Sequence, residues 1–285
     1  MRWVFGKVYK DIRQSKGLTQ EEICDDMLAR STLARIEGGQ VIPKFDTFIF
    51  LLQQINMNLE EFEYICNVYQ PSERQKLLNI ANNNLSITDN TELLSLKRQC
   101  QEYLQIHYDI PIQQLLDRLT VTIHVREFSG ESKDTTFQET TQKIWHYLEK
   151  QNTWYQNDFK LLLTILYHFP LETLKTITPK ILTNLVKYTD LYNIKPLQLT
   201  LLTNLASIYL DNHQTKECET FSLEALKLAK KLKRYDFLGI AQVRLGSCRD
   251  DNSLIDKGMS LLHLTEKGEK IFEALEQEVA KHKKI

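Results

Sequence analysis

The sequence has no apolar run that approaches the roughly 18 residues a membrane-spanning helix needs. Its first residues also lack the charged stretch, apolar stretch and small-residue cleavage site of a secretory signal. Hydrophobic residues make up 42% of the chain and charged residues 26%, which is ordinary for a soluble globular protein. We therefore expect a cytoplasmic protein with no membrane partner.

Motifs for catalysis and cofactor binding are also missing. The nine glycines form neither a G-x-x-x-x-G-K phosphate loop nor a dinucleotide-binding fingerprint, and there is no H-E-x-x-H metal motif. The seven histidines are scattered, and the five cysteines form neither a C-x-x-C pair nor a Cys/His metal spacing. The sequence therefore predicts reduced thiols and no catalytic residue, no metal and no cofactor, so an enzyme would rest on no observed motif.

An excess of positive charge is missing as well. The net charge is −1, and residues 1–66 carry eight Lys or Arg against ten Asp or Glu, a balance of −2. This balance disfavours a strongly basic nucleic-acid binder, although a local basic face can still bind phosphate. Such a face is expected around residues 30–37, near Lys10, Arg13, Lys16, Arg30, Arg35 and Lys44.

The stretch from residue 17 to 43, GLTQEEICDDMLARSTLARIEGGQVIP, has the spacing of a helix-turn-helix. Thr19 and Glu22 form a capping box, which predicts a helix that begins at Gln20. A second short helix is expected from Arg30 to Glu37, and it should stop at the double glycine that follows because Gly supplies the left-handed backbone that ends helices. Pro43 then leads toward a further helix.

This stretch resembles the repressor-like helix-turn-helix of the xenobiotic-response-element family. The residues that carry the resemblance are GLTQ at 17–20, the apolar Ile23, Leu33 with Arg35–Glu37, and then Gly38 and Pro43. The turn CDDMLARST departs from that family because it has no Gly, is one residue shorter and puts Ala29 at the expected cap. A missing cap typically costs about 0.5–2 kcal/mol. The same short turn, and a similar chain length, are found in the Rgg-type (RRNPP, quorum-sensing) transcriptional regulators, which the chain therefore resembles.

The resemblance implies a cytoplasmic homodimer that binds double-stranded promoter DNA and responds to a short signalling peptide. In the helix-turn-helix register, Arg30 and Thr32 lie near the start of the second helix and face the major groove with Ser31 and Arg35. Arg13 and Gln20 would lie near phosphate. The expected DNA-binding residues are thus Arg13, Gln20, Arg30, Ser31, Thr32 and Arg35.

The rest of the chain predicts an all-α fold. Helical-period segments are expected at about 72–82, 91–107, 112–125, 137–150, 155–169 and 171–190, and onward to the end. The run LTVTIHV at 119–125 is rich enough in β-branched residues to leave a strand possible, and residues 127–135 are expected to form an exposed loop. We expect a DNA-binding domain at 1–66, a linker at 67–75 and a helical-repeat domain for peptide binding and dimerisation at 76–285.

A repeat is expected near the C-terminus because Ala206 and Ala241, Cys218 and Ser253, and Ala225 and Ser260 are each 35 residues apart. The register is similar to the tetratricopeptide pattern, whose stacked helix pairs form a concave face that suits an extended peptide. Asn204 is the main candidate because an amide can donate to and accept from a peptide backbone at once. The expected peptide-binding residues are Asn184, Tyr188, Asn204, Ser207, Gln242 and Arg244.

Three alternatives stay open at this point. Asn184 and Asn204 could bond only within their own helices, with Tyr188 packed in the core. The last helix, expected at 266–279, carries Ile271, Leu275 and Val279 on one face, which suits either a cap on the repeat stack or contact with a symmetry mate. Finally, the whole chain could be a protein-interaction scaffold whose helix-turn-helix module does not bind DNA.

Overall fold

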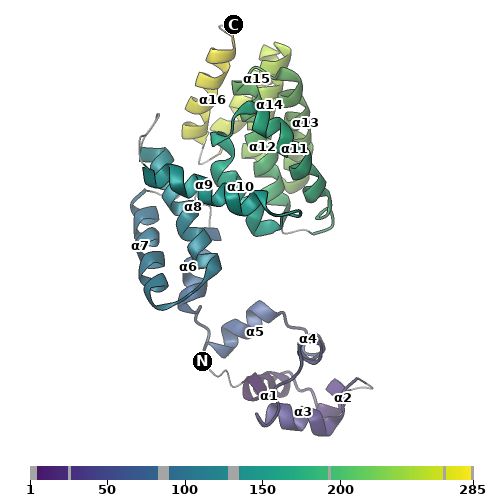
Figure 1. The fold of residues 1–285 in the computed structure, drawn as a ribbon. Coiled ribbons are helices and arrows are strands. Elements are labelled where there is room, and N and C mark those ends of the chain that lie inside the picture. Colours follow the sequence, from purple (N-terminus) through teal and green to yellow (C-terminus); the bar gives the residue numbers. More distant parts are fainter. Residues whose placement is uncertain are drawn as a thin grey trace. The chain divides into compact units, whose positions relative to one another are not determined.

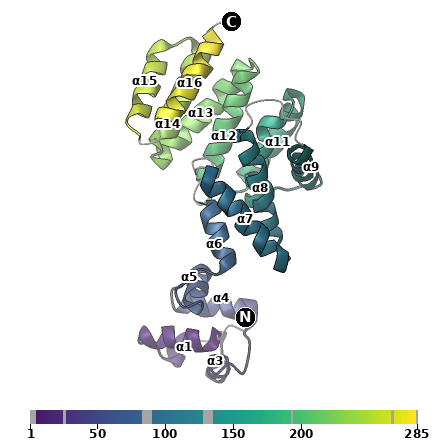
Figure 2. The same ribbon diagram turned by 90° about the vertical axis from the view of Figure 1, so that its left-hand side faces the viewer.

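The computed structural model describes residues 5–24, 27–82, 90–127, 135–191, 194–265 and 268–283. The chain divides into two compact units, one formed by residues 1–88 and 98–112 and the other by 89–97 and 113–285. Within the described ranges every regular element is a helix and no strand occurs, as predicted (Figures 1 and 2). None of the helices in those ranges is long and apolar enough to cross a membrane.

The first unit begins with short helices that enclose a small core. They are α1 (Phe5–Ser15), α2 (Gln20–Cys24), α3 (Arg30–Glu37), α4 (Phe45–Gln54), α5 (Leu59–Cys66) and α6 (Glu73–Asn82). Buried apolar residues spaced by three or four positions bring the first five helices together. This core is made of Tyr9, Ile12, Ile23, Cys24, Leu33, Ile36, Leu51, Leu52, Ile55 and Phe62.

The local signals for α2 and α3 are confirmed. Helix α2 begins at Gln20, and the Thr19 hydroxyl accepts from the Glu22 backbone N–H at 3.2 Å while the Thr19 N–H donates to the Glu22 carboxylate at 2.7 Å. Helix α3 spans Arg30–Glu37, and Ala29 makes no side-chain cap. Gly39 has a φ of +69°, so it is the second glycine of the pair that takes the left-handed conformation after the helix.

Two long helices cross the division between the units, α7 (Asn90–Ile106) and α8 (Ile110–Glu127). The ambiguous run at 119–125 is helical, although its buried apolar residues Leu119, Val121 and Ile123 alternate as they would in a strand. The expected loop at 127–135 falls mostly on residues outside the described ranges.

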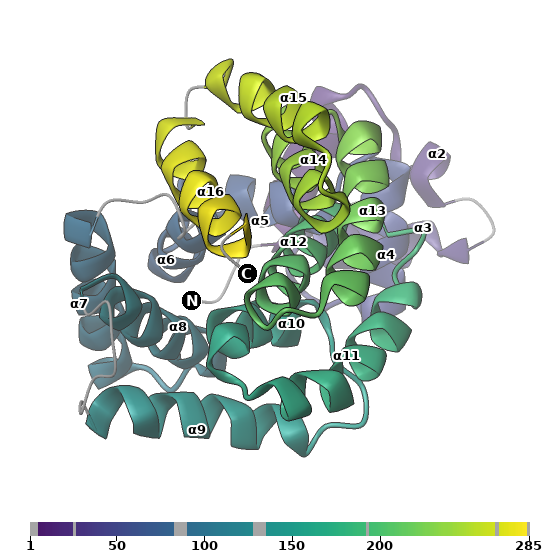
Figure 3. The same cartoon turned by 90° about the horizontal axis from the view of Figure 1, so that it is seen from above.

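The second unit continues with the helices that follow α8. They are α9 (Thr135–Glu149), α10 (Gln156–Ile165) with a 3₁₀ turn η2 (Leu166–His168), α11 (Leu171–Val186), α12 (Lys195–Asp211), α13 (Thr215–Leu232), α14 (Tyr235–Arg249), α15 (Asn252–His263) and α16 (Gly268–Lys283). Helices α12 to α15 each pack against the next, which is the arrangement of stacked helix pairs (Figure 3).

The register of the repeat differs from the expected one in its second helix. Ala206 and Ala241 are both buried, but Ser253 and Ser260 are exposed where Cys218 and Ala225 are buried. The buried residues of α15, which are Ile255, Gly258 and Leu262, follow Cys218, Phe221 and Ala225 of α13 by 37 positions. The 35-residue spacing is therefore wrong for these helices.

Helices α14 and α15 approach closely at two glycines. A Cβ on Gly258 would lie 2.7 Å from the Gly239 carbonyl oxygen, and a Cβ on Gly239 would lie 2.8 Å from the Gly258 carbonyl oxygen. Helix α16 then covers α14 and α15, because Leu275 is buried and Ile271 and Val279 pack against the same cluster. The apolar face of the last helix thus packs on the repeat stack as a cap, which is the first of the two roles considered for it.

Candidate functional site

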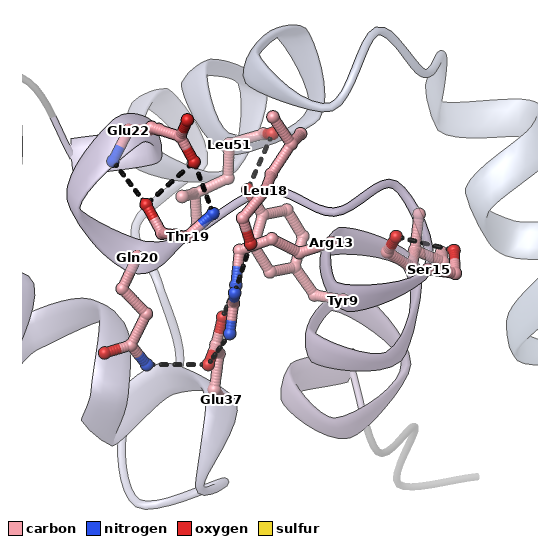
Figure 4. A network of polar contacts seen from close by, with 10 residues as sticks. Tyr9, Arg13, Ser15, Leu18, Thr19, Gln20, Glu22, Glu37 and Leu51 are labelled. Carbon is pink, nitrogen blue, oxygen red and sulfur yellow. Dashed lines mark hydrogen bonds and ion pairs between the residues drawn. The ribbon is translucent and has the colours of Figure 1, made fainter.

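A buried ion pair joins α1 to α3 in the first unit. Arg13 Nε donates to Glu37 Oε1 at 2.6 Å and Arg13 Nη2 donates to Glu37 Oε2 at 3.0 Å, while Nη1 donates to the Leu18 carbonyl at 2.5 Å (Figure 4). The two side chains are only 7% and 3% exposed. The hydrogen bonds to Glu37 raise the pKa of Arg13 despite the burial that would lower it.

This geometry corrects the role expected for Arg13. All three of its described bonds point into the domain and the side chain is buried, so it cannot also reach a phosphate on the outside. Gln20 belongs to the same network because its Nε2 donates to Glu37 Oε2 at 2.8 Å (Figure 4). Glu37, which sequence reasoning assigned only to the end of α3, is the acceptor that holds α1, α2 and α3 together.

The other expected DNA-binding residues lie on the outside of α3. Arg30, Ser31 and Arg35 are exposed, and Thr32 is half-buried. No described residue forms an ion pair with Arg30 or Arg35. Two guanidinium groups on one short helix, each without a carboxylate partner in the described part of the chain, leave their donors available to an anionic duplex.

A second polar cluster lies in the second unit, where α16 meets α12 and α14. Arg244 Nε and Nη2 donate to the two oxygens of Glu278 at 2.8 and 3.0 Å, and Nη1 donates to the Thr203 carbonyl at 2.7 Å. Ser207 also donates to Glu278, at 3.1 Å. Burial acts to lower the pKa of Arg244, but the charge and hydrogen bonds of Glu278 outweigh it and raise the pKa.

Two further residues belong to this cluster and were not expected from the sequence. Tyr167, in the turn after α10, lies near this cluster: burial raises its pKa, and the charge of Arg244 and the hydroxyl of Ser207 act in the opposite direction. Glu278 itself lies three positions after buried Leu275, so it shares the inward face of α16. A carboxylate beside the apolar stripe of the last helix was the signal that could have indicated a buried partner for Arg244.

Asn184 and Tyr188 belong to a different set of contacts. Asn184 Oδ1 accepts from the Trp154 backbone N–H at 3.2 Å, and its Nδ2 donates to the Lys180 carbonyl at 2.8 Å, so both ends of the amide are occupied. Tyr188 packs edge-on against Phe159, with ring centroids 6.4 Å apart. The structure brings Ser207 and Arg244 together but does not bring Asn184 and Tyr188 to them.

Asn204 and Gln242 complete the expected set. Asn204 lies half-buried in the middle of α12, one turn before Ser207, and forms no hydrogen bond within the described part of the chain. Gln242 is buried in α14, and its Oε1 has no hydrogen-bond partner among the described residues. Among the same residues no group of His, Cys, Asp and Glu side chains is placed to hold a metal ion.

Two family models match the chain. Residues 10–62 match a helix-turn-helix model, and residues 89–237, more than half of the chain, match the C-terminal domain of the HTH-type transcriptional regulator Rgg. The chain belongs to the Rgg family. The resemblance indicated by the short Gly-free turn is therefore confirmed, and the Rgg family is one of transcriptional regulators.

Solved structures share the fold of this Rgg-family chain over nearly its full length. A candidate transcriptional regulator from Listeria monocytogenes EGD-e is 17% identical, with a TM-score of 0.74 and 99% of each chain covered. The Streptococcus dysgalactiae SHP pheromone receptor Rgg2 is 16% identical, with a TM-score of 0.68 and 97% and 99% of the two chains covered. Bacillus thuringiensis PlcR, in complex with the peptide PapR7 and DNA, is 15% identical, with a TM-score of 0.66 and 99% and 98% covered.

Proposed function

We propose that this protein is a cytoplasmic regulator of transcription that binds a two-fold promoter site as a homodimer and is switched by a short signalling peptide. We infer no catalytic activity and no cofactor. In this proposal residues 1–66 form the DNA-binding domain, 67–75 the linker and 76–285 the peptide-binding and dimerisation domain. The family supports the regulatory part, and similarity to a pheromone receptor and to a regulator bound to peptide and DNA supports the remainder.

The observation that carries the DNA part is the exposed face of α3. Arg30, Ser31, Thr32 and Arg35 lie on a helix whose position is fixed from inside by Glu37. Such a helix can enter the major groove with side chains that reach base edges, while its own orientation stays rigid. Gln20 lies beside this helix and has its Oε1 left to accept a hydrogen bond. Arg13 is not included among the DNA contacts.

The homodimer follows from the small size of that face. One short helix with two arginines supplies few contacts, and two-fold symmetry doubles them on a repeated half-site. The net charge of −2 in residues 1–66 also favours a dimer. Sequence-independent attraction between this domain and the DNA phosphates should be weak, so specific binding needs the DNA-binding domains of both subunits.

The peptide part rests on the first helices of the stacked pairs. Asn204 presents a half-buried amide with no described partner, which suits capture of an extended backbone. Ser207 and Arg244 both bond Glu278 and so hold α16 beside the helix that carries Asn204. Asn184 has a structural role, because its Oδ1 accepts from the Trp154 backbone N–H. Tyr188 and Gln242 remain expected contacts, with Gln242 Oε1 available as an acceptor.

A rival function is an interaction scaffold whose helix-turn-helix does not bind DNA, and the acidic balance of residues 1–66 favours it. Selection of random duplexes by the native protein, followed by gel-shift titration at moderate salt, separates the two. Enrichment of a two-fold motif, bound more tightly than a scrambled duplex, supports the regulator. Equal binding of the motif and the scrambled duplex would reject it in favour of the scaffold.

A further inference from the structure

Helices α13 and α14 form a hairpin that places two cysteines at one level. Two residues connect the helices, and Arg249 Nε, at the end of α14, donates to Glu219 Oε1, near the start of α13, at 2.7 Å. The two helices therefore run antiparallel, and each step away from the turn along one is matched by a step along the other. Cys218 and Cys248 adjoin the two members of this ion pair, so they lie at the same level of the hairpin to within about one helical turn.

Both cysteines belong to the faces that α13 and α14 bury between them. Cys218 is part of a large core cluster of the second unit, and Cys248 packs against that cluster. Seven residues closer to the turn on each helix, Ala225 and Ala241 are buried in the same cluster. Small side chains at this spacing allow two helices to approach closely. Close approach is what a disulfide requires, since its two Cα atoms lie within about 7 Å of each other.

The two thiols differ in access and in acidity. Cys218 is fully buried, with its Sγ 3.8 Å from the Ser222 hydroxyl oxygen, whereas Cys248 lies half-buried in the last turn of α14. The Cys218 thiol lowers the pKa of Cys248, although burial acts to raise it, because a thiol can donate to a neighbouring thiolate. Burial alone dominates at Cys66, a half-buried thiol of α5, and raises its pKa to about 11. Cys248 is therefore the accessible thiol with the greater thiolate character, and the thiolate is the reactive form.

We propose that Cys218 and Cys248 are a redox modification site at which hydrogen peroxide forms a reversible disulfide between α13 and α14. The Cys248 thiolate attacks one peroxide oxygen, the O–O bond breaks, and the leaving hydroxide takes a proton from solvent to become water, which leaves a sulfenic acid on Cys248. Cys218 then attacks this sulfur, the S–S bond forms, and the sulfenic oxygen leaves as a second water with the proton of Cys218. The two thiols lose two electrons in total, and the peroxide gains them.

The link would join successive helix pairs of the stack. Both thiols are free in the structure, which is the reduced state, and a dithiol reductant would restore that state by thiol–disulfide exchange. Helix α13 is the second helix of one pair and α14 is the first helix of the next. The rotation between neighbouring pairs sets the curvature of a repeat stack, so the disulfide would fix that curvature at one junction. The inference does not depend on DNA or peptide binding.

The test treats the reduced full-length protein with a small molar excess of hydrogen peroxide. Remaining thiols are alkylated at set times, and the protein is digested without reduction and analysed by mass spectrometry. A peptide pair joined through Cys218 and Cys248 should appear and should disappear after treatment with dithiothreitol. Cys248 should be consumed at least about tenfold faster than Cys66, as its greater thiolate fraction requires. Absence of the joined pair while Cys248 stays open to alkylation would overturn the proposal.

Three variants separate the roles of the thiols. Cys66→Ser is the matched control and should form the same link. Cys248→Ser should leave Cys218 reduced, because the buried thiol has no accessible partner to react first. Cys218→Ala should stop at a sulfenic acid on Cys248, which dimedone traps. Random pairing among all the cysteines of the native protein would show that oxidation follows unfolding, and would overturn the site.

A second measurement follows the native protein alone. The oxidised form should melt about 5 °C or more above the reduced form, because the link closes a loop in the unfolded chain. Dithiothreitol should reverse this shift, and the same peroxide treatment should leave the melting temperature of Cys248→Ser unchanged. A lower melting temperature for the linked protein would show that the hairpin has to distort to bring the two sulfurs together, and would overturn the proposal.

Discussion

Glu278 of α16 holds the buried guanidinium of Arg244 with both carboxylate oxygens, at 2.8 and 3.0 Å. The pair is the polar link between the last helix and the face that carries Asn204. We therefore expect Glu278→Gln to weaken the second unit by about 3–5 kcal/mol, since loss of one charge leaves the other buried and unpaired. Urea unfolding measures the change. Glu276→Gln, on the exposed side of α16, should be nearly neutral, and equal effects of the two variants would contradict the role assigned to Glu278.

The buried Arg13–Glu37 pair predicts that a substitution at Arg13 lowers the stability of the domain, whereas a phosphate contact at Arg13 would predict weaker DNA binding. Arg13→Met should destabilise the first unit by about 3–5 kcal/mol, and Arg13→Met combined with Glu37→Leu should recover most of the loss because no buried charge remains. In the double variant the slope of log binding constant against log salt should equal that of the native protein. A slope reduced by about one unit would show instead that Arg13 contacts phosphate.

Arg30 is expected to read a base. Arg30→Ala should lose about 1–3 kcal/mol on the selected duplex and relax the preference at one base position, if its fork binds guanine. Gel-shift titration on the selected duplex and on single-base variants of it measures both effects. Arg98→Ala, which removes an exposed arginine in a loose 3.8 Å pair with Glu102, serves as control. An unchanged base profile in Arg30→Ala would reject this contact.

Asn204 is expected to hold the peptide backbone. Asn204→Ala should weaken the binding of short peptides by about 1–3 kcal/mol, because their buried backbone groups lose a partner, while the unfolding midpoint and DNA binding without peptide stay the same. Fluorescence polarisation with a library of labelled short peptides gives the affinity. If Asn204→Ala binds as tightly as the native protein, the backbone-binding residue lies elsewhere.

The close approach of α14 and α15 predicts a strong effect from a single methyl group. Gly258→Ala should destabilise the second unit by about 1–3 kcal/mol, since the new Cβ would lie 2.7 Å from a backbone oxygen. Ser260→Leu, at the exposed position that the 35-residue spacing marks as a packing site, should change stability by less than about 0.5 kcal/mol. Thermal unfolding of both variants would decide between the two registers, and the reverse order would favour the 35-residue spacing.

Local features could be predicted from the sequence because their causes lie within a few residues. The start of α2 depends on Thr19 and Glu22, and the end of α3 depends on the two glycines that follow it. The short turn before Arg30 also indicated the family. Helical periodicity further along the chain placed α6 to α11 and α16 to within a few residues of their bounds.

Long-range partners could not be predicted in the same way. Arg13 and Arg35 look alike in sequence, yet one is buried on Glu37, 24 positions away, and the other is exposed. The partner of Arg244 lies 34 positions away in another helix. The repeat register failed for a related reason, since packing between helices sets which face of α15 is buried, and that face is shifted by two residues relative to the 35-residue spacing of Ala206 in α12 and Ala241 in α14.

The network around Glu37 also limits which substitutions the helix-turn-helix domain can accept during evolution. A chain that loses Arg13 keeps a buried carboxylate, and a chain that loses Glu37 keeps a buried guanidinium, so each intermediate is less stable than either end point. Positions 13 and 37 should therefore change together among descendants of this sequence, even though neither touches the outer face of α3. Arg30, Ser31 and Arg35 carry no such coupling, and their exposed side chains can vary with the operator while the fold beneath them stays constant.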